Sequence, residues 1–233
     1  MPTAFLITGT DTGVGKTWAT CRLGSALRGL GYPVRLLKPV VTGTPSGTVP
    51  DDTRLLCEVA GESPDIVTGW SFVEPAAPPV AAKAEGRTLR IEEISAWIAG
   101  RILADGVTLI EGAGGLYCPL TERESFADLA IAHNLPLVVV ARRGLGTINH
   151  TLLTLEAAHR RGSSVALLCV SETQPGTGVA HDTAPAEIFA RCRAWFPGLL
   201  PPVVLPYADA AGAELSLSAI DWPGLLRGLG RSR

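Results

Sequence analysis

Residues 9–17 read GTDTGVGKT, and they lie between an apolar run at 4–7 and an amphipathic segment at 16–28. This order predicts a strand, a glycine-rich loop and a helix, which is the context of a phosphate-binding loop. Glycines let successive backbone N–H groups point inward, and the start of the helix adds positive potential. Lys16 is placed to reach the outer phosphates, and the Thr17 hydroxyl is placed to bind magnesium. The common pattern GxxxxGK[ST] has its first glycine at position 10. Because Gly9 stands one residue earlier, we expect a loop that is one residue longer.

Short apolar runs alternate with amphipathic stretches along the rest of the chain. This pattern predicts an α/β fold, a mostly parallel sheet with helices on both faces. The predicted strands are residues 4–7, 34–37, 107–110, 137–140, 165–170 and 203–205. The predicted helices are residues 16–28, 51–59, 91–103, 125–132, 147–159 and 185–195. Proline-rich passages near Pro45 and at 75–79 and 197–202 are expected to be ordered loops. A length of 233 residues favours one domain over residues 1–233.

The composition argues against several classes of protein. Hydrophobic residues make up 46% of the chain and charged residues 18%, as in a compact fold rather than a disordered one. A net charge of −2, with no long run of one sign, argues against a nucleic-acid surface. The longest apolar stretch, near 135–141, is far shorter than the ~20 residues of a membrane span. No signal peptide precedes the first strand and no CxxC pair is present, so we expect a cytoplasmic protein without membrane or nucleic-acid partners.

Lysine is scarce in this sequence. Arginine outnumbers it seventeen to three, and the lysines are Lys16, Lys38 and Lys83. Lys38 opens the segment KPVVTG (38–43), directly after the second predicted strand. A lysine at a strand end is more often a solvated charge, but its scarcity and the neighbouring phosphate loop favour a functional role. Two ammonium groups there would neutralise the charge of a transferred phosphoryl group.

Three further segments could carry chemistry. Glu111 opens EGAGG (111–115), where a carboxylate could hold magnesium while the glycines let a ligand approach; the alternative is a tight turn. Asp51 and Asp52 are either helix N-caps or magnesium ligands, and the residues alone leave both open. The segment LGTINH (145–150) begins a helix whose free N–H groups could bind a carboxylate, or it is an ordinary cap. No GxGxxG follows a strand and no Ser-His-Asp order stands out, which disfavours hydride transfer and acyl-enzyme chemistry.

Taken together, these segments resemble the dethiobiotin synthetases, the ATP-dependent enzymes of biotin synthesis. The resemblance runs over residues 3–155. Its motifs are GTDTGVGKT, KPVVTG, PDDTRLL (50–56), FVEPAAPPVAA (72–82), VTLIEGAGGLYCPL (107–120), FADLA (126–130), LPLVVVA (135–141) and LGTINHTLLT (145–154). The order of GTDTGVGKT, KPVVTG and EGAGG is specific, whereas GKT alone would indicate only a P-loop protein.

The resemblance implies a P-loop NTPase-like fold, a homodimer, and a reaction of 7,8-diaminopelargonic acid, carbon dioxide (or bicarbonate) and MgATP. The products would be dethiobiotin, ADP and phosphate. It implies that Lys38 and Lys16 are catalytic, and that Thr17, Asp52 and Glu111 hold magnesium. The implied nucleotide-binding residues are Gly13, Val14, Gly15, Lys16, Thr17, Asp52, Glu111, Gly112, Ala113, Gly114, Pro206, Tyr207 and Ala208. The implied substrate-binding residues are Thr12, Thr42, Leu145, Gly146, Thr147 and Asn149, of which the last four receive the substrate carboxylate across the dimer interface.

The sequence also departs from the family. No asparagine follows the predicted strand at 165–170, where the family commonly reads the adenine edge, so we expect other nucleoside triphosphates to be accepted besides ATP. Pro79 stands where the family often has histidine. Two rival interpretations are a partition-type ATPase and the nucleotide domain of a cobyrinic acid amide synthetase. The first would have a second lysine in the loop, where this chain has Asp11, and the second needs a glutaminase domain for which the chain has no length.

Overall fold

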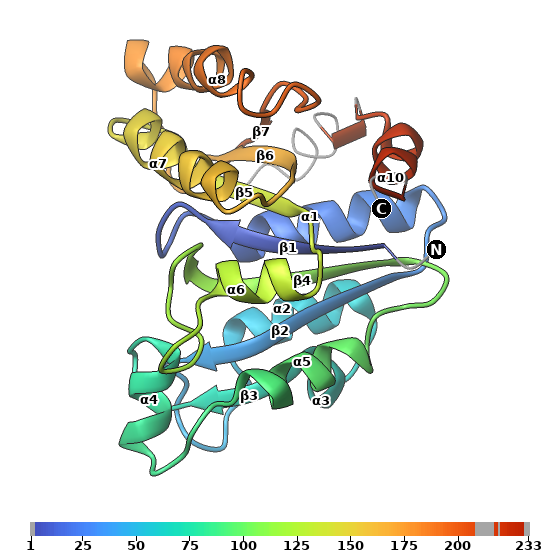
Figure 1. Ribbon diagram of the computed structural model, residues 1–233, viewed down its shortest axis with the longest axis vertical. Coiled ribbons are helices and arrows are strands. Elements are labelled where there is room, and N and C mark those ends of the chain that lie inside the picture. The colour runs from blue at the N-terminus through green and yellow to red at the C-terminus, as the bar shows by residue number, and fades with distance from the viewer. Residues whose placement is uncertain (1–2, 208–216, 219, 231–233) are drawn as a thin grey trace.

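Seven strands form one sheet in the order β3-β2-β4-β1-β5-β6-β7 (Figure 1). The computed structural model describes residues 3–207, 217–218 and 220–230. The strands are β1 (Thr3–Gly9), β2 (Val34–Thr42), β3 (Thr68–Phe72), β4 (Val107–Gly115), β5 (Leu137–Arg142), β6 (Val165–Ser171) and β7 (Val203–Leu205). Each neighbouring pair in this sheet is parallel. The carboxyl ends of the strands therefore meet at one edge, on the left in Figure 1.

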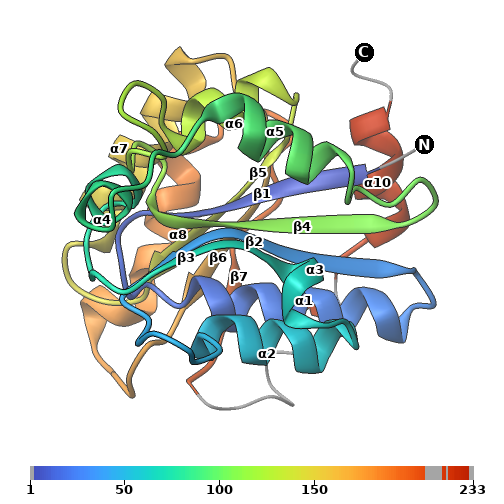
Figure 2. The ribbon, with the colours of Figure 1, turned by 90° about the horizontal axis from the view of Figure 1, so that it is seen from below.

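Helices cover both faces of the sheet (Figure 2). One face packs against α1 (Lys16–Gly29), α2 (Asp51–Ala60), α3 (Pro64–Val67) and α10 (Trp222–Gly230). The other packs against α4 (Pro78–Ala84), α5 (Ile91–Ala99), α6 (Phe126–Ala132), α7 (Thr147–Arg160) and α8 (Val179–Cys192). The predicted α/β fold, a mostly parallel sheet with helices on both faces, is thus confirmed. No helix among the described residues is long and apolar enough to cross a membrane.

Alternation of side chains along each strand builds two separate cores. In β1, Phe5 and Ile7 belong to the core beneath α1, whereas Leu6 belongs to the core on the opposite face. Successive strand residues point to opposite faces, and both faces are covered, so nearly every position in a central strand must be apolar. Each fully buried Leu, Ile or Phe stabilises the fold by about 1.5–3 kcal/mol. This explains why the sequence shows continuous apolar runs rather than alternation with polar residues.

Four elements were not predicted from the sequence: β3, α3, α4 and α10. The strand β3 lies at the sheet edge, is mostly half-buried, and contains Gly69, so it lacks the apolar run of a central strand. Residues 75–79 were predicted as a loop, which is wrong for the last two, because α4 begins at Pro78. Proline is tolerated in the first turn of a helix, where its missing N–H has no partner in any case.

Two predicted helices have bounds that differ from the structure by more than one residue. The helix expected at 91–103 ends at Ala99, before Gly100. The helix expected at 185–195 is α8, which contains Pro185 in its interior rather than at its start. Pro185 has no N–H to donate to the carbonyl of His181. The guanidinium Nε of Arg143 donates to that carbonyl instead, at 3.0 Å, and so satisfies it.

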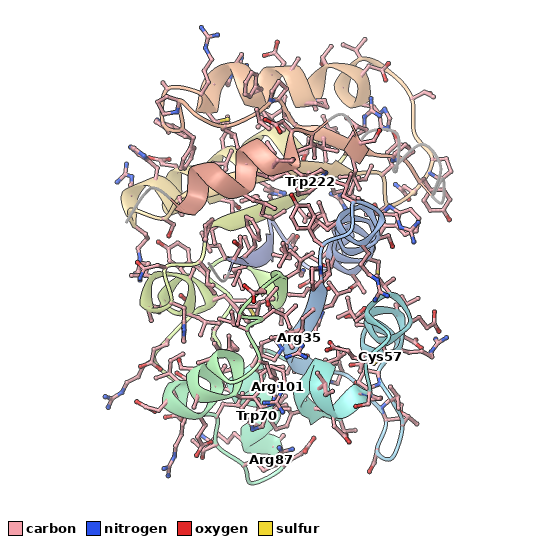
Figure 3. The ribbon with its side chains drawn as sticks, turned by 90° about the vertical axis from the view of Figure 1, so that its right-hand side faces the viewer. Arg35, Cys57, Trp70, Arg87, Arg101 and Trp222 are labelled. Atoms are coloured by element: carbon pink, nitrogen blue, oxygen red, sulfur yellow. The ribbon has the colours of Figure 1, made fainter. Side chains whose placement is uncertain are left out.

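Arginine and tryptophan side chains pack together near the β3 edge of the sheet (Figure 3). Arg35 donates to Glu62 and to the backbone carbonyl of Arg101. The Arg101 guanidinium lies 4.3 Å from the ring centroid of Trp97, and the rings of Trp70 and Trp97 are 6.1 Å apart. These contacts join β2, β3 and α5, and they account for several of the arginines as structural residues.

Candidate active site

A cavity of about 940 Å³ opens where the phosphate loop meets the carboxyl ends of the strands. Its wall has three parts: the loop with the starts of α1 and α2, the end of β2 with residues 75–78, and residues at or just after the ends of β4, β6 and β7. The lining residues are Thr12, Gly13, Gly15, Lys16, Thr17, Trp18, Lys38, Val40, Val41, Thr42, Asp52, Pro75, Ala76, Ala77, Pro78, Glu111, Ala113, Gly114, Cys118, Ser171, Glu172, Thr173 and Tyr207. The cavity thus lies where ligands bind in parallel α/β sheets.

The phosphate loop curls around Lys16. Gly13 and Gly15 both have positive φ, at 71° and 90°, in the left-handed region that glycine adopts without strain. Gly15 also leaves no room for a side chain, because a Cβ there would lie 2.6 Å from the Ser171 hydroxyl. The Lys16 ammonium donates to the carbonyl of Asp11 at 3.3 Å, and the residue is 8% exposed. The longer loop therefore still places its lysine in the cavity wall.

Lys38 joins two carboxylates that come from different elements. Its ammonium, on β2, donates to Asp52 Oδ2 at 2.8 Å and to Glu111 Oε1. The exposed fraction is 5% for Lys38 and 0% for Glu111. The sequence predicted both Lys38 and Glu111 at the ends of strands, but β2 continues to Thr42 and β4 to Gly115, so both residues lie inside the sheet. Opposite charges must lie this close when both are buried, since an unpaired buried charge is costly.

Thr17 completes this cluster. Its hydroxyl lies 2.9 Å from Asp52 Oδ1 and 2.8 Å from Glu111 Oε1. Glu111 Oε2 is buried and has no hydrogen-bond partner among the described residues. An orphaned carboxylate oxygen, a second carboxylate and a hydroxyl are hard oxygen donors of the kind that Mg²⁺ takes, with phosphate and water filling the other positions. The residues present therefore fit a magnesium ion held by Thr17, Asp52 and Glu111.

The two lysines differ in their electrostatic surroundings. Burial, together with the nearby charge of Lys38, lowers the pKa of Lys16 below its usual value. Burial acts in the same direction on Lys38, but the carboxylates of Glu111 and Asp52 overcome it and raise the pKa of that ammonium. The charge of Lys38 in turn lowers the pKa of Asp52, against the effect of burial. Lys38 is therefore a fixed cation, and Asp52 a fixed anion, near neutral pH.

The site residues predicted from the sequence fall into three groups. Those that line the cavity are Thr12, Gly13, Gly15, Lys16, Thr17, Lys38, Thr42, Asp52, Glu111, Ala113, Gly114 and Tyr207. Val14, Gly112, Pro206, Leu145, Gly146, Thr147 and Asn149 do not line it, and Ala208 lies outside the described residues. Val14 packs into the core beneath α1, so only its backbone can face a phosphate. Leu145, in contrast, is 86% exposed just before α7.

Sequence reasoning missed part of the wall. Trp18, Val40 and Val41 adjoin predicted site residues, and that adjacency was the available signal. Residues 75–78 lie within the family motif FVEPAAPPVAA (72–82), but they were not predicted to line the site. Ser171, Glu172 and Thr173 follow the predicted strand at 165–170, where the sequence indicated only that the family's usual asparagine is missing. Cys118 carried no signal, and burial raises the pKa of its thiol, so it stays protonated at neutral pH.

Comparisons with known proteins identify relatives of this chain. A family model described as an AAA domain matches residues 3–201. The chain is 44% identical over 187 residues to the ATP-dependent dethiobiotin synthetase BioD of Anaeromyxobacter sp. (strain K), a match that covers 78% of this chain and 82% of that protein. It is 35% identical over 200 residues to the protein of the same name from Bacillus velezensis, covering 85% and 86%. The corresponding protein of Aquifex aeolicus is 41% identical over 160 residues, covering 69% and 72%.

Proposed function

The chain belongs to the dethiobiotin synthetase family, and we propose that it catalyses the ATP-dependent closure of 7,8-diaminopelargonic acid and carbon dioxide to dethiobiotin, with release of ADP and phosphate. One observation carries the proposal: Lys16, Lys38 and the Thr17–Asp52–Glu111 oxygens converge on one cavity beside the phosphate loop. This is the set of charges that in-line phosphoryl transfer requires.

The chemistry needs no nucleophile from the protein. A free amine of the substrate captures carbon dioxide as a carbamate and loses a proton. A carbamate oxygen attacks the γ-phosphorus, and ADP leaves. The second amine then attacks the carbonyl carbon of the carbamic-phosphate intermediate, the ring closes, and phosphate leaves as the amine loses its proton. The protein must supply alignment and positive charge, and those are the features this cavity offers.

Each residue of the cluster has a distinct task in this scheme. Backbone N–H groups of residues 13–17 would hold the phosphates, and Lys16 would contact the outer ones. Lys38 would stabilise the charge on the transferred phosphoryl group. Thr17, Asp52 and Glu111 would hold magnesium, which when bound neutralises charge on the phosphate oxygens.

We place the diamine against the end of β2. Val40 and Val41 with residues 75–78 form an apolar wall there, and Thr42 adds a hydroxyl. The segment 145–149 would receive the substrate carboxylate from the partner subunit of a homodimer. Two apolar side chains, Leu145 and Leu153, are 86% and 57% exposed on this segment and on α7, which supports a surface for a second copy. We also propose a cytoplasmic location, because the five cysteines, all among the described residues, are free.

A coupled assay tests the activity. Phosphate release by the purified chain should rise only when diaminopelargonate, bicarbonate, magnesium and ATP are all present, and dethiobiotin should appear in equal amount by mass spectrometry. A partition-type ATPase would release phosphate from ATP without the diamine. Phosphate release at the same rate with and without the diamine would therefore reject the proposed function.

A further inference from the structure

The cavity extends past the phosphate loop on the side of β6 and β7. There it is lined by Trp18, Ser171, Glu172, Thr173 and Tyr207. The opposite side, toward β2, holds the Lys38 cluster and the apolar wall. Because the loop lies between the two sides, a nucleotide whose outer phosphates reach Lys38 has its base at the β6 side.

Trp18 lies on that side by helix geometry. Gly15 faces Ser171 and Thr173, whereas Thr17 faces Asp52 and Glu111. Residues three apart on a helix share a face, so Trp18 follows Gly15 toward β6. The ring packs against the core beneath α1, and the Arg22 guanidinium lies 4.7 Å from its centroid. Arg22 holds the ring and covers one of its faces, so only the part of the ring that lines the cavity is left for a ligand.

The carboxylate at this end of the cavity is already engaged. Glu172 forms an ion pair with Arg143, and Nε2 of His181 lies 3.5 Å from the same carboxylate oxygen. The other oxygen accepts a hydrogen bond from the backbone N–H of Tyr207 at 3.1 Å. Arg143 is itself fixed by the His181 carbonyl that Pro185 leaves unbonded. Glu172 thus ties β6 to the backbone at Tyr207, and both of its carboxylate oxygens already have partners within the protein.

The hydroxyl next to it is also poorly placed to read a base. Ser171 is 1% exposed and its hydroxyl lies against Gly15, at the phosphate loop. Thr173 offers a methyl group toward the same glycine. The two aromatic residues at this end of the cavity, Trp18 and Tyr207, are therefore the candidates for contact with a base.

We propose that Trp18 holds the nucleotide base by ring contact, and that Glu172 positions Tyr207 beside it without reading the base. The inference rests on the proposed function and specifies its nucleotide class: purine and pyrimidine triphosphates bind with similar affinity. Every base has a π-face, so contact with an aromatic ring contributes to affinity without selecting a base. The sequence predicted a relaxed preference from a missing asparagine, and the structure adds the residue that takes over binding.

Equilibrium binding to the full chain with magnesium, in the absence of the diamine, tests this proposal. The ligands are ATP, GTP, CTP, UTP and ribose 5-triphosphate, measured by calorimetry. The wild-type chain should bind the four nucleotides within about tenfold of one another, and ribose 5-triphosphate about tenfold or more weakly. Trp18→Ala should bring all four nucleotides to the affinity of ribose 5-triphosphate, and Trp18→Phe should retain part of the difference.

Trp70→Ala is the matched control, because it removes an indole that does not line the cavity. Circular dichroism confirms that each variant is folded. Unchanged affinities in Trp18→Ala, or a preference above tenfold for one base in the wild type, would overturn the proposal. The proposed function is tested by a different measurement, the formation of dethiobiotin with ATP. If no dethiobiotin forms, the proposed function is rejected, whatever the nucleotide affinities are.

Discussion

Replacing Lys38 by methionine should separate its structural role from its chemical role. The side chain keeps its volume but loses the ammonium that pairs with Glu111, a fully buried carboxylate, and with Asp52, which is 43% exposed on its side chain. Breaking a buried pair by removing one partner costs about 3–5 kcal/mol. The exposed partner adds little to this figure, so Glu111 sets the expected loss. For a chain of this size the loss corresponds to a fall of roughly 10 °C in melting temperature.

Magnesium should reverse much of that loss. The ion would sit on the same carboxylate oxygens and restore a cation beside them. In EDTA, Lys38→Met should melt well below the wild type, and with millimolar magnesium the gap should narrow. Turnover should not recover, because the charge that stabilises the transferred phosphoryl group is missing; a loss of about 10²–10³ in kcat is expected. Nucleotide affinity should change little.

The assays are calorimetric melting with and without magnesium, and single-turnover product formation. Lys83→Met is the control, since Lys83 is an exposed residue of α4 outside the cavity. If Lys38→Met melts at the same temperature as the wild type in EDTA, the buried pair does not stabilise the fold. Turnover within tenfold of the wild type would remove Lys38 from the chemistry.

Three other changes test separate parts of the structure. Thr17→Val should weaken magnesium-dependent nucleotide binding by about tenfold or more, measured by calorimetry, whereas a serine there should keep it. Gly15→Ala should lower the free energy of unfolding by roughly 1–2 kcal/mol from left-handed strain, and the clash of its Cβ with the Ser171 hydroxyl adds to this loss. Ser171→Gly should restore only the part that is due to the clash, measured by urea titration, and a fully stable Gly15→Ala chain would contradict the positive φ. Burial acts to raise the pKa of Asp128, but hydrogen bonds from Ser125 and the charge of Arg161 outweigh it and lower that pKa in the folded chain. The ionised carboxylate therefore stabilises the fold above the ordinary pKa of an aspartate. This stabilisation is lost as the pH falls through the lower pKa of the folded state. Asp128→Asn should thus cost about 1 kcal/mol at neutral pH and little in strong acid, and an equal cost at both would refute it.

The centre of the fold and of the site could be predicted because it depends on local signals. A parallel sheet buried on both faces requires continuous apolar runs, and these mark β1, β4, β5 and β6 in the sequence. The phosphate loop is recognisable because glycine spacing, Lys16 and Thr17 lie within nine residues. Glu111 and Lys38 could be placed near it because parallel strands end at one edge.

The β6 side of the cavity could not be predicted, because its geometry depends on contacts between distant segments. Arg143 pairs with Glu172 and also donates to the His181 carbonyl, which Pro185 of α8 leaves available. In the sequence that proline indicated a helix start, since proline is most often found there. The edge strand β3 was missed for a related reason: its stability comes from β2 and from Trp97 rather than from its own pattern.

The use of lysine at position 38, in a chain that otherwise favours arginine, has a physical reason in this geometry. An ammonium carries three donors on one small atom, and Asp52 and Glu111 accept two of them. The third donor remains for a phosphoryl oxygen, so Lys38 can contact substrate without breaking the buried pair. A guanidinium is planar and holds its donors in a fork suited to one carboxylate. At a site only 5% exposed it could not turn to serve two carboxylates and a phosphate at once.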